Sequence, residues 1–210
     1  NDTADLSGAV SDGAPVATVV LDLGGVTNNM LILASGIAGA AVTNTCPAGV
    51  TNTLYLAAGG VVYVGAGETL VLDNNLVPLG DIYKRGEGTL VLGRKASYPA
   101  AKLTYFFVEG GRVVSRGPML NLSPRVGKPD RNVPGMDPEF INEDLPDARI
   151  TGYIFLAMMS MADTNPGNGV FIQRGGYVNP SVDWGNRTVV GFAVAGASAG
   201  GTGTYRLDGG

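Results

Sequence analysis

The chain has 210 residues, of which 45% are hydrophobic, 15% are charged and 33 are glycine, and its formal net charge is −4 at pH 7. It contains no histidine and a single cysteine, Cys46, so Ser-His-Asp and Cys-His nucleophile systems, histidine-ligated metal sites and an intrachain disulfide are excluded. The negative charge argues against general nucleic-acid binding, and the longest apolar runs are too short to span a bilayer.

Charge is distributed unevenly along the chain. Residues 1–83 carry seven acidic and no basic side chains, whereas residues 84–116 carry seven basic and two acidic ones. Surfaces of unlike charge attract, so this asymmetry favours end-to-end contacts between subunits. The chain begins with asparagine and shows no signal-like segment, so we expect a mature or processed product.

Short apolar runs bounded mostly by Gly, Asn or Asp follow one another from residue 19 onward. This pattern is typical of strands and turns, and many copies at close spacing predict an all-β domain. The clearest runs are residues 19–23, 30–33, 53–56, 61–64, 69–72 and 89–92.

Three of these runs share the pattern Thr-Leu-x-Leu, beginning at Thr53, Thr69 and Thr89. Their spacings of 16 and 20 residues are typical of the coils of a parallel β-solenoid. Alternate residues of a strand share a face, so both leucines of each run are predicted to point inward. Stacking would then align two interior ladders, one of Leu54, Leu70 and Leu90 and the other of Leu56, Leu72 and Leu92.

Residues 121–149 break this pattern, with five prolines and few apolar side chains. Proline cannot donate to a central ladder, so we expect a long irregular excursion between solenoid coils at 1–120 and 150–210 of the same domain. The last coils are expected to continue or to pair with a neighbour.

Two groups of side chains are candidate binding sites. Asp137, Glu139, Glu143 and Asp144 supply oxygen ligands suited to calcium, although the D-x-D-x-D-G spacing is absent and a solvated loop is the alternative. Trp184, with Tyr177 and Asp183, offers a flat apolar face on which a sugar ring can stack. A buried core tryptophan is the other interpretation.

The stretch from Tyr83 to Gly93 resembles the autotransporter-associated β-strand repeat. The matching positions are Lys84, Gly86, Gly88, the run Thr89-Leu90-Val91-Leu92 and Gly93, followed by Tyr98, Thr104 and the turn at Gly110-Gly111. The resemblance implies a right-handed parallel β-helix in a secreted bacterial surface protein, of the kind that serves structure and display rather than chemistry.

These observations lead to one functional hypothesis with two alternatives. The first is a non-enzymatic, extracellular structural segment of a surface stalk, fibre or layer that assembles end to end into a homo-oligomer or filament, without cofactor unless calcium binds. The second is an adhesin module that binds glycans. The third is a polysaccharide-active enzyme using Asp81, Lys84 and Arg112. The rival fold is a β-sandwich subunit that polymerises by strand exchange, with residues 1–18 as the donated strand.

Overall fold

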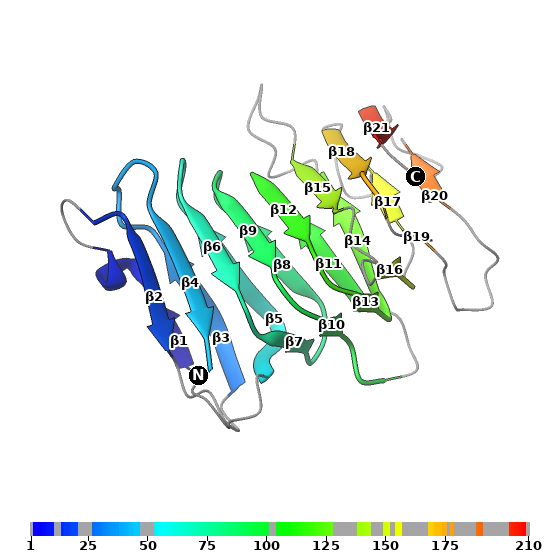
Figure 1. Cartoon of the computed structure of the whole chain (residues 1–210). Helices are drawn as coiled ribbons and strands as arrows, with labels where there is room; N and C mark the ends of the chain where they lie inside the picture. The colour runs from blue at the N-terminus through cyan, green and yellow to red at the C-terminus, as the bar shows by residue number, and fades with distance from the viewer. Residues whose placement is uncertain are drawn as a thin grey trace.

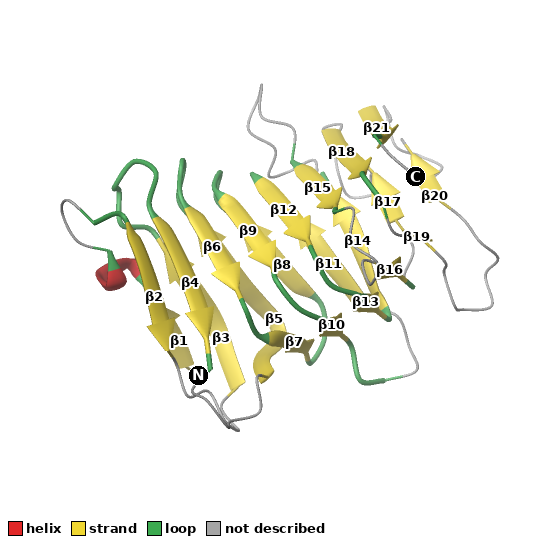
Figure 2. Cartoon of the chain, viewed as in Figure 1, coloured by secondary structure: helices red, strands yellow, loops and turns green. Residues whose placement is uncertain are grey.

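The computed structural model describes residues 2–10, 14–20, 27–46, 53–100, 104–127, 138–143, 149–151, 154–156, 168–175, 177–178, 188–190 and 202–208. These residues form a parallel β-solenoid, and the strands of its smaller sheet, from β2 to β21, lie side by side in chain order (Figures 1 and 2). Every strand pairing between described residues is parallel. The solenoid prediction is therefore confirmed, and the β-sandwich alternative is wrong.

The strands belong to two sheets. The 8-stranded sheet contains β2 (Val16–Val20), β4 (Ala41–Thr45), β6 (Thr69–Leu72), β9 (Thr89–Leu92), β12 (Arg112–Ser115), β15 (Glu139–Asn142), β18 (Asn168–Gln173) and β21 (Thr202–Leu207). The 13-stranded sheet contains β1 (Asp2–Asp5), β3 (Thr27–Leu33), β5 (Thr53–Val64), β7 (Asn75–Pro78), β8 (Ile82–Arg85), β10 (Ala96–Ser97), β11 (Thr104–Val108), β13 (Met119–Leu120), β14 (Leu122–Val126), β16 (Arg149–Ile150), β17 (Ile154–Leu156), β19 (Tyr177–Val178) and β20 (Thr188–Val190).

The larger sheet forks at β5. The first part of β5 pairs with β7, and its second part pairs with β8. From β7 onward each coil therefore contributes three strands, as in β7–β8–β9 and β10–β11–β12, and each strand lies on its counterpart in the next coil. Coil length is not constant: Thr69 lies over Thr89 after 20 residues, but Val170 lies over Thr204 after 34.

The interior is a set of aliphatic and aromatic ladders produced by alternation along each strand. Leu70 lies over Leu90 and Leu72 over Leu92, and all four side chains are buried. Further along the same ladder Phe140 and Phe171 stack with ring centroids 5.5 Å apart. Val71 and Val91 point the other way, into a separate apolar cluster on the outer face.

The predicted third member of each leucine ladder is wrong. Leu54 and Leu56 are buried, but they lie on β5 in the larger sheet, where Leu54 pairs with Leu76 rather than with Leu70. The Thr-Leu-x-Leu pattern specifies an inward-facing alternation, and both sheets require that alternation. The pattern therefore predicts burial without saying which sheet the strand joins.

The expected excursion at 121–149 is also wrong in its extent. β14 and β15 lie inside it and continue the two sheets. Pro124 is tolerated in β14, opposite Phe106, because β14 pairs with the following strand β17 only from Arg125 onward. The missing N–H therefore interrupts no pairing of the described strands. Residues 128–137 and 144–148 lie outside the described residues.

Glycine at the corners lets successive coils approach closely. Gly86 follows β8 with φ +75°, and a Cβ there would lie 2.1 Å from the carbonyl oxygen of Val64 in the preceding coil. Any side chain at this position would have to displace backbone. This glycine is one of the positions of the repeat-like stretch.

Candidate functional site

An aromatic row crosses the outer face of the larger sheet, defined here as Tyr83, Tyr105, Phe107, Arg125 and Phe155. Tyr83, Phe107, Arg125 and Phe155 occupy equivalent positions on the successive strands β8, β11, β14 and β17. The rings of Tyr83 and Phe107 are nearly parallel, at 9°, with centroids 4.9 Å apart. This spacing matches the distance between neighbouring strands, so the rings stack along the solenoid axis.

Arg125 is the charged member of the aromatic row. Its guanidinium carbon lies 4.3 Å from the ring centroid of Tyr105, 5.1 Å from that of Phe155 and 5.4 Å from that of Phe107. Burial lowers the pKa of Arg125, yet arginine remains charged in proteins. The row therefore combines flat apolar groups with a cation held by cation–π contacts.

One strand of the aromatic row, β11, is anchored by Asp81. Its carboxylate accepts hydrogen bonds from the Thr104 hydroxyl at 2.7 Å and from the Tyr105 backbone N–H at 2.9 Å. These bonds link the residue before β8 to the first two residues of β11. Asp81 is thereby committed to positioning its neighbours.

Lys84 is the most unusual polar side chain of the interior. It lies in β8 between Val62 and Val108 of the adjacent coils and is fully buried. Its Nζ donates to three backbone carbonyls at the corner, those of Arg85 at 2.9 Å, Gly86 at 2.7 Å and Gly110 at 3.1 Å. Burial lowers the pKa of Lys84 from 10.5 to about 7.

Asp81, Lys84 and Arg112 do not form a common site. Lys84 is interior, Asp81 bonds to the start of β11, and Arg112 lies on the outer face of the smaller sheet. The geometry expected of the polysaccharide-active alternative is therefore not found in these residues.

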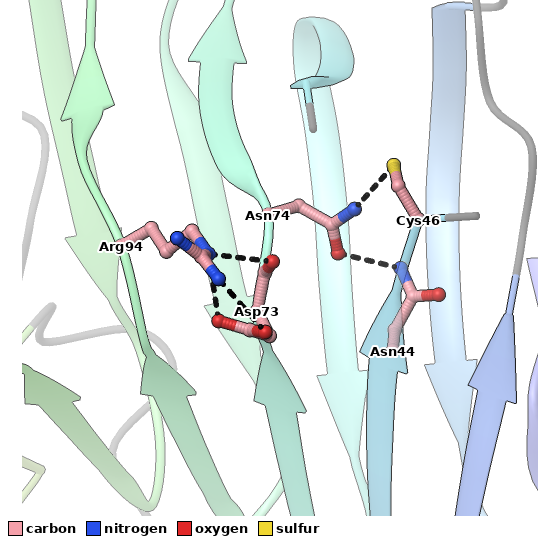
Figure 3. Close-up of polar contacts among 5 residues, drawn as sticks. All are labelled: Asn44, Cys46, Asp73, Asn74 and Arg94. Carbon is pink, nitrogen blue, oxygen red and sulfur yellow. Dashed lines mark hydrogen bonds and ion pairs between the residues drawn. The ribbon is translucent and has the colours of Figure 1, made fainter. Parts of the chain in front are cut away.

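Ion pairs join neighbouring coils along the outer surface. Arg85 contacts Glu109 at 2.7 Å, and Arg174 contacts Glu143 at 3.3 Å. Arg94 and Asp73 also pair across coils at 2.8 Å, as Figure 3 shows. Basic and acidic side chains of the sequence thus pair between adjacent coils of the same chain. The exposed pairs Arg94–Asp73 and Arg174–Glu143 each contribute at most about 1 kcal/mol, whereas the Glu109 side chain is only 2% exposed.

The calcium candidates are separated by these pairs. Glu139 contacts Arg112 at 2.6 Å, and Glu143 lies four residues further along, next to Arg174. Asp137 and Asp144 lie outside the described residues. Within the described part of the chain, no group of three acidic or cysteine side chains is arranged to hold a metal ion.

The glycan candidates fall largely beyond what the structure describes. Trp184 and Asp183 lie outside the described residues, and Tyr177 begins β19. No helix in the described segments is long and apolar enough to cross a membrane.

Cys46 belongs to a small polar cluster at the end of β4. The Asn44 amide donates to the Asn74 side-chain oxygen at 3.1 Å, and the Asn74 amide donates to the Cys46 sulfur at 3.1 Å (Figure 3). Asn44 is fully buried at the interior position that Leu72 occupies in the next coil. The cysteine is thus a partly buried, hydrogen-bonded thiol that joins two coils.

Two features were missed by sequence reasoning. Predicting the aromatic row requires the pairing register of four strands, which no local sequence pattern contains. Lys84 did carry a signal: it shares the alternation phase of Ile82, so the pattern places it inward despite its charge. Its charge obscured that signal.

Comparison with known proteins found no matching family model, no matching curated protein and no matching solved structure.

Proposed function

We propose that this protein is an extracellular structural β-solenoid segment of a bacterial surface stalk, fibre or layer, and that it self-assembles. The observation that carries the proposal is the continuous parallel pairing of the 8-stranded sheet from β2 to β21, with ion pairs between neighbouring coils. Such a quasi-one-dimensional body gains length without changing its cross-section, which suits a spacer.

The repeat-like stretch supports the same proposal through the roles of its residues. Lys84 closes a corner through three carbonyls, and Gly86 permits the close approach of the coils there. Leu90 and Leu92 continue the interior ladder. These four residues of the resemblance thus contribute to the coil itself, which supports a structural and display role.

The proposal is tested by locating the protein on cells. Antibodies raised against the folded domain are applied to intact and to permeabilised cells of the source organism, followed by immunogold electron microscopy. We expect labelling of intact cells in stalks, fibres or a continuous layer. Labelling confined to permeabilised cells would contradict an extracellular role.

A glycan-binding adhesin is the second candidate, favoured by the aromatic row and by Tyr63, whose side chain is 37% exposed on the neighbouring strand β5. Against it, the stacked faces of Tyr83 and Phe107 cover one another. A glycan array probed with the wild type and with a Tyr63→Ala/Tyr105→Ala variant separates the two functions. Binding that the double substitution removes would favour the adhesin.

A further inference from the structure

The two outermost strands of the 8-stranded sheet, β2 and β21, concentrate the exposed apolar side chains of the described residues. Among the described residues five large hydrophobic residues are exposed, and three of them lie on these two strands: Val16 at 72%, Val20 at 56% and Leu207 at 67%. Natural proteins usually protect edge strands with charge, proline or a covering segment. β2, with the sequence Val-Ala-Thr-Val-Val, has neither charge nor proline.

The backbone of both strands is oriented for further pairing. The Pro15 carbonyl accepts from the Ala41 N–H, and alternate residues of a parallel strand bond to the same side. The N–H and C=O groups of Val16, Thr18 and Val20 therefore point away from β4. Likewise Asp208 N–H donates to the Gln173 carbonyl, so Tyr205 and Leu207 direct their backbone groups away from β18. No described strand pairs with either open side.

The two ends of the solenoid differ in how the core is covered. At the first coil Leu6 and Val10, which flank the short helix η1 (Ser7–Ala9), are buried as part of the core. At the last coil Leu207 occupies the interior ladder position of Asn142 and Gln173, yet it is largely exposed. A further coil on this side would cover it.

We propose that β21 of one copy pairs in parallel with β2 of a second copy, so that the solenoid continues across the junction. This proposal rests on the proposed function and names its partner surface. Ladder continuity fixes the register. Val19 and Leu207 occupy the same interior ladder at its two ends. Leu207 therefore lies opposite Val19 of the next copy.

The same register places the large Tyr205 over the small Ala17, and Arg206 opposite Thr18. Tyr205 already stacks on Phe171, with centroids 5.1 Å apart, so Ala17 would meet the other face of its ring. The backbone pattern agrees: the outward N–H and C=O groups of Leu207 face those of Val20 and Thr18. Parallel strand direction, hydrogen-bond phase and side-chain size are thus satisfied together.

Disulfide trapping tests this register directly. In a Cys46→Ser background, Thr18→Cys and Arg206→Cys introduce two thiols at exposed outer positions. In the proposed junction their Cα atoms would be about 4.8 Å apart, within disulfide range. Mild oxidation at high protein concentration should give a ladder of covalent oligomers on a non-reducing gel.

The matched control replaces Arg206→Cys by Thr204→Cys, with Thr18→Cys unchanged. Thr204 is also exposed on the outer face of β21, but in the proposed register it lies opposite Val16. Its Cα would then be roughly 8 Å from that of Thr18, too far for a disulfide without backbone movement. We expect at least a tenfold lower yield of oligomers. Equal yields, or no oligomers with either pair, would overturn the proposal.

Sedimentation of the unmodified chain provides the second measurement. The wild type should self-associate with rising concentration, and Thr18→Pro should remove that association, because it deletes an N–H on the open side and leaves the bonds to β4 intact. Thr18→Lys is a second blocking variant that does not alter the backbone. A wild type that remains monomeric at the highest concentration would overturn the docking proposal, whereas surface labelling of cells would still support the structural function.

Discussion

The buried lysine makes the stability of the solenoid depend on pH in a direction opposite to that of a paired surface lysine. In the unfolded chain Lys84 holds its proton up to about pH 10.5, whereas in the folded protein burial lowers its pKa to about 7. Between these values the unfolded state binds more protons, so the free energy of unfolding rises with pH. Below about pH 7 both states are protonated, and this group contributes no slope.

The size of the effect follows from the pKa difference. Each pH unit is worth about 1.4 kcal/mol, so the upper limit is about 5 kcal/mol between pH 7 and pH 10.5, and about 3 kcal/mol up to pH 9.5. The three carbonyl acceptors of Lys84 favour the ammonium form. They therefore reduce the effect below this limit.

The test compares urea unfolding of the wild type, Lys84→Met and Lys95→Met from pH 7 to pH 9.5, followed by circular dichroism. Lys95 is exposed in the turn after β9, so its substitution should preserve the pH slope of the wild type. Lys84→Met should remove the part of the slope that belongs to the buried ammonium. Parallel stability curves for the wild type and Lys84→Met would refute this reasoning.

Two point substitutions and one segment replacement test the coil geometry. Leu90→Ala should lower the free energy of unfolding by about 2–5 kcal/mol, because Leu90 is fully buried over Leu70, and a loss below about 0.5 kcal/mol in urea unfolding would contradict that register. Gly86→Ala should cost more than Gly36→Ala, since both glycines have positive φ but only Gly86 meets backbone within 4 Å; equal losses in the same assay would show that the close approach is unimportant. Replacing residues 121–149 by a Gly/Ser linker removes β14 and β15, so the β signal in circular dichroism should collapse, and its retention would contradict their place in the core.

The strand fold and the burial of the leucines could be predicted from the alternation of apolar residues with a period of two. Leu70, Leu72, Leu90 and Leu92 alternate with side chains that face outward, and a one-residue slip would expose them all. That constraint is local, so it is visible in four residues. The assignment of Leu54 to one sheet or the other depends on its pairing with Leu76 of β7, a contact with the next coil that the four residues do not encode.

Other features depended on non-local register and were out of reach of local patterns. From the sequence, Pro124 is expected to interrupt a strand. It nevertheless lies in β14, because β17 does not pair with that position. Arg125 reads as an ordinary surface charge until β11 and β17 place three rings around it. In a parallel solenoid such neighbours are separated by a whole coil, and coil length varies from corner to corner.

The distribution of charge leads to a final prediction about assembly. The sequence suggests attraction between an acidic first third and a basic middle, which salt would screen. In the structure three of these basic side chains contact acids of adjacent coils: Arg85 contacts Glu109, Arg94 contacts Asp73 and Arg112 contacts Glu139. The strands at the proposed junction contribute little charge: β2 has none, and Arg206 of β21 pairs with Asp208 of its own chain.

Association through β2 and β21 should therefore rely on backbone hydrogen bonds and on burial of Val16, Val20 and Leu207. Neither contribution is screened by simple salt, and apolar burial weakens on cooling. The sedimentation-derived association constant should change less than threefold between 50 mM and 500 mM sodium chloride and should fall at low temperature. A decrease of tenfold or more with salt would mean that charge, rather than strand pairing, holds the copies together.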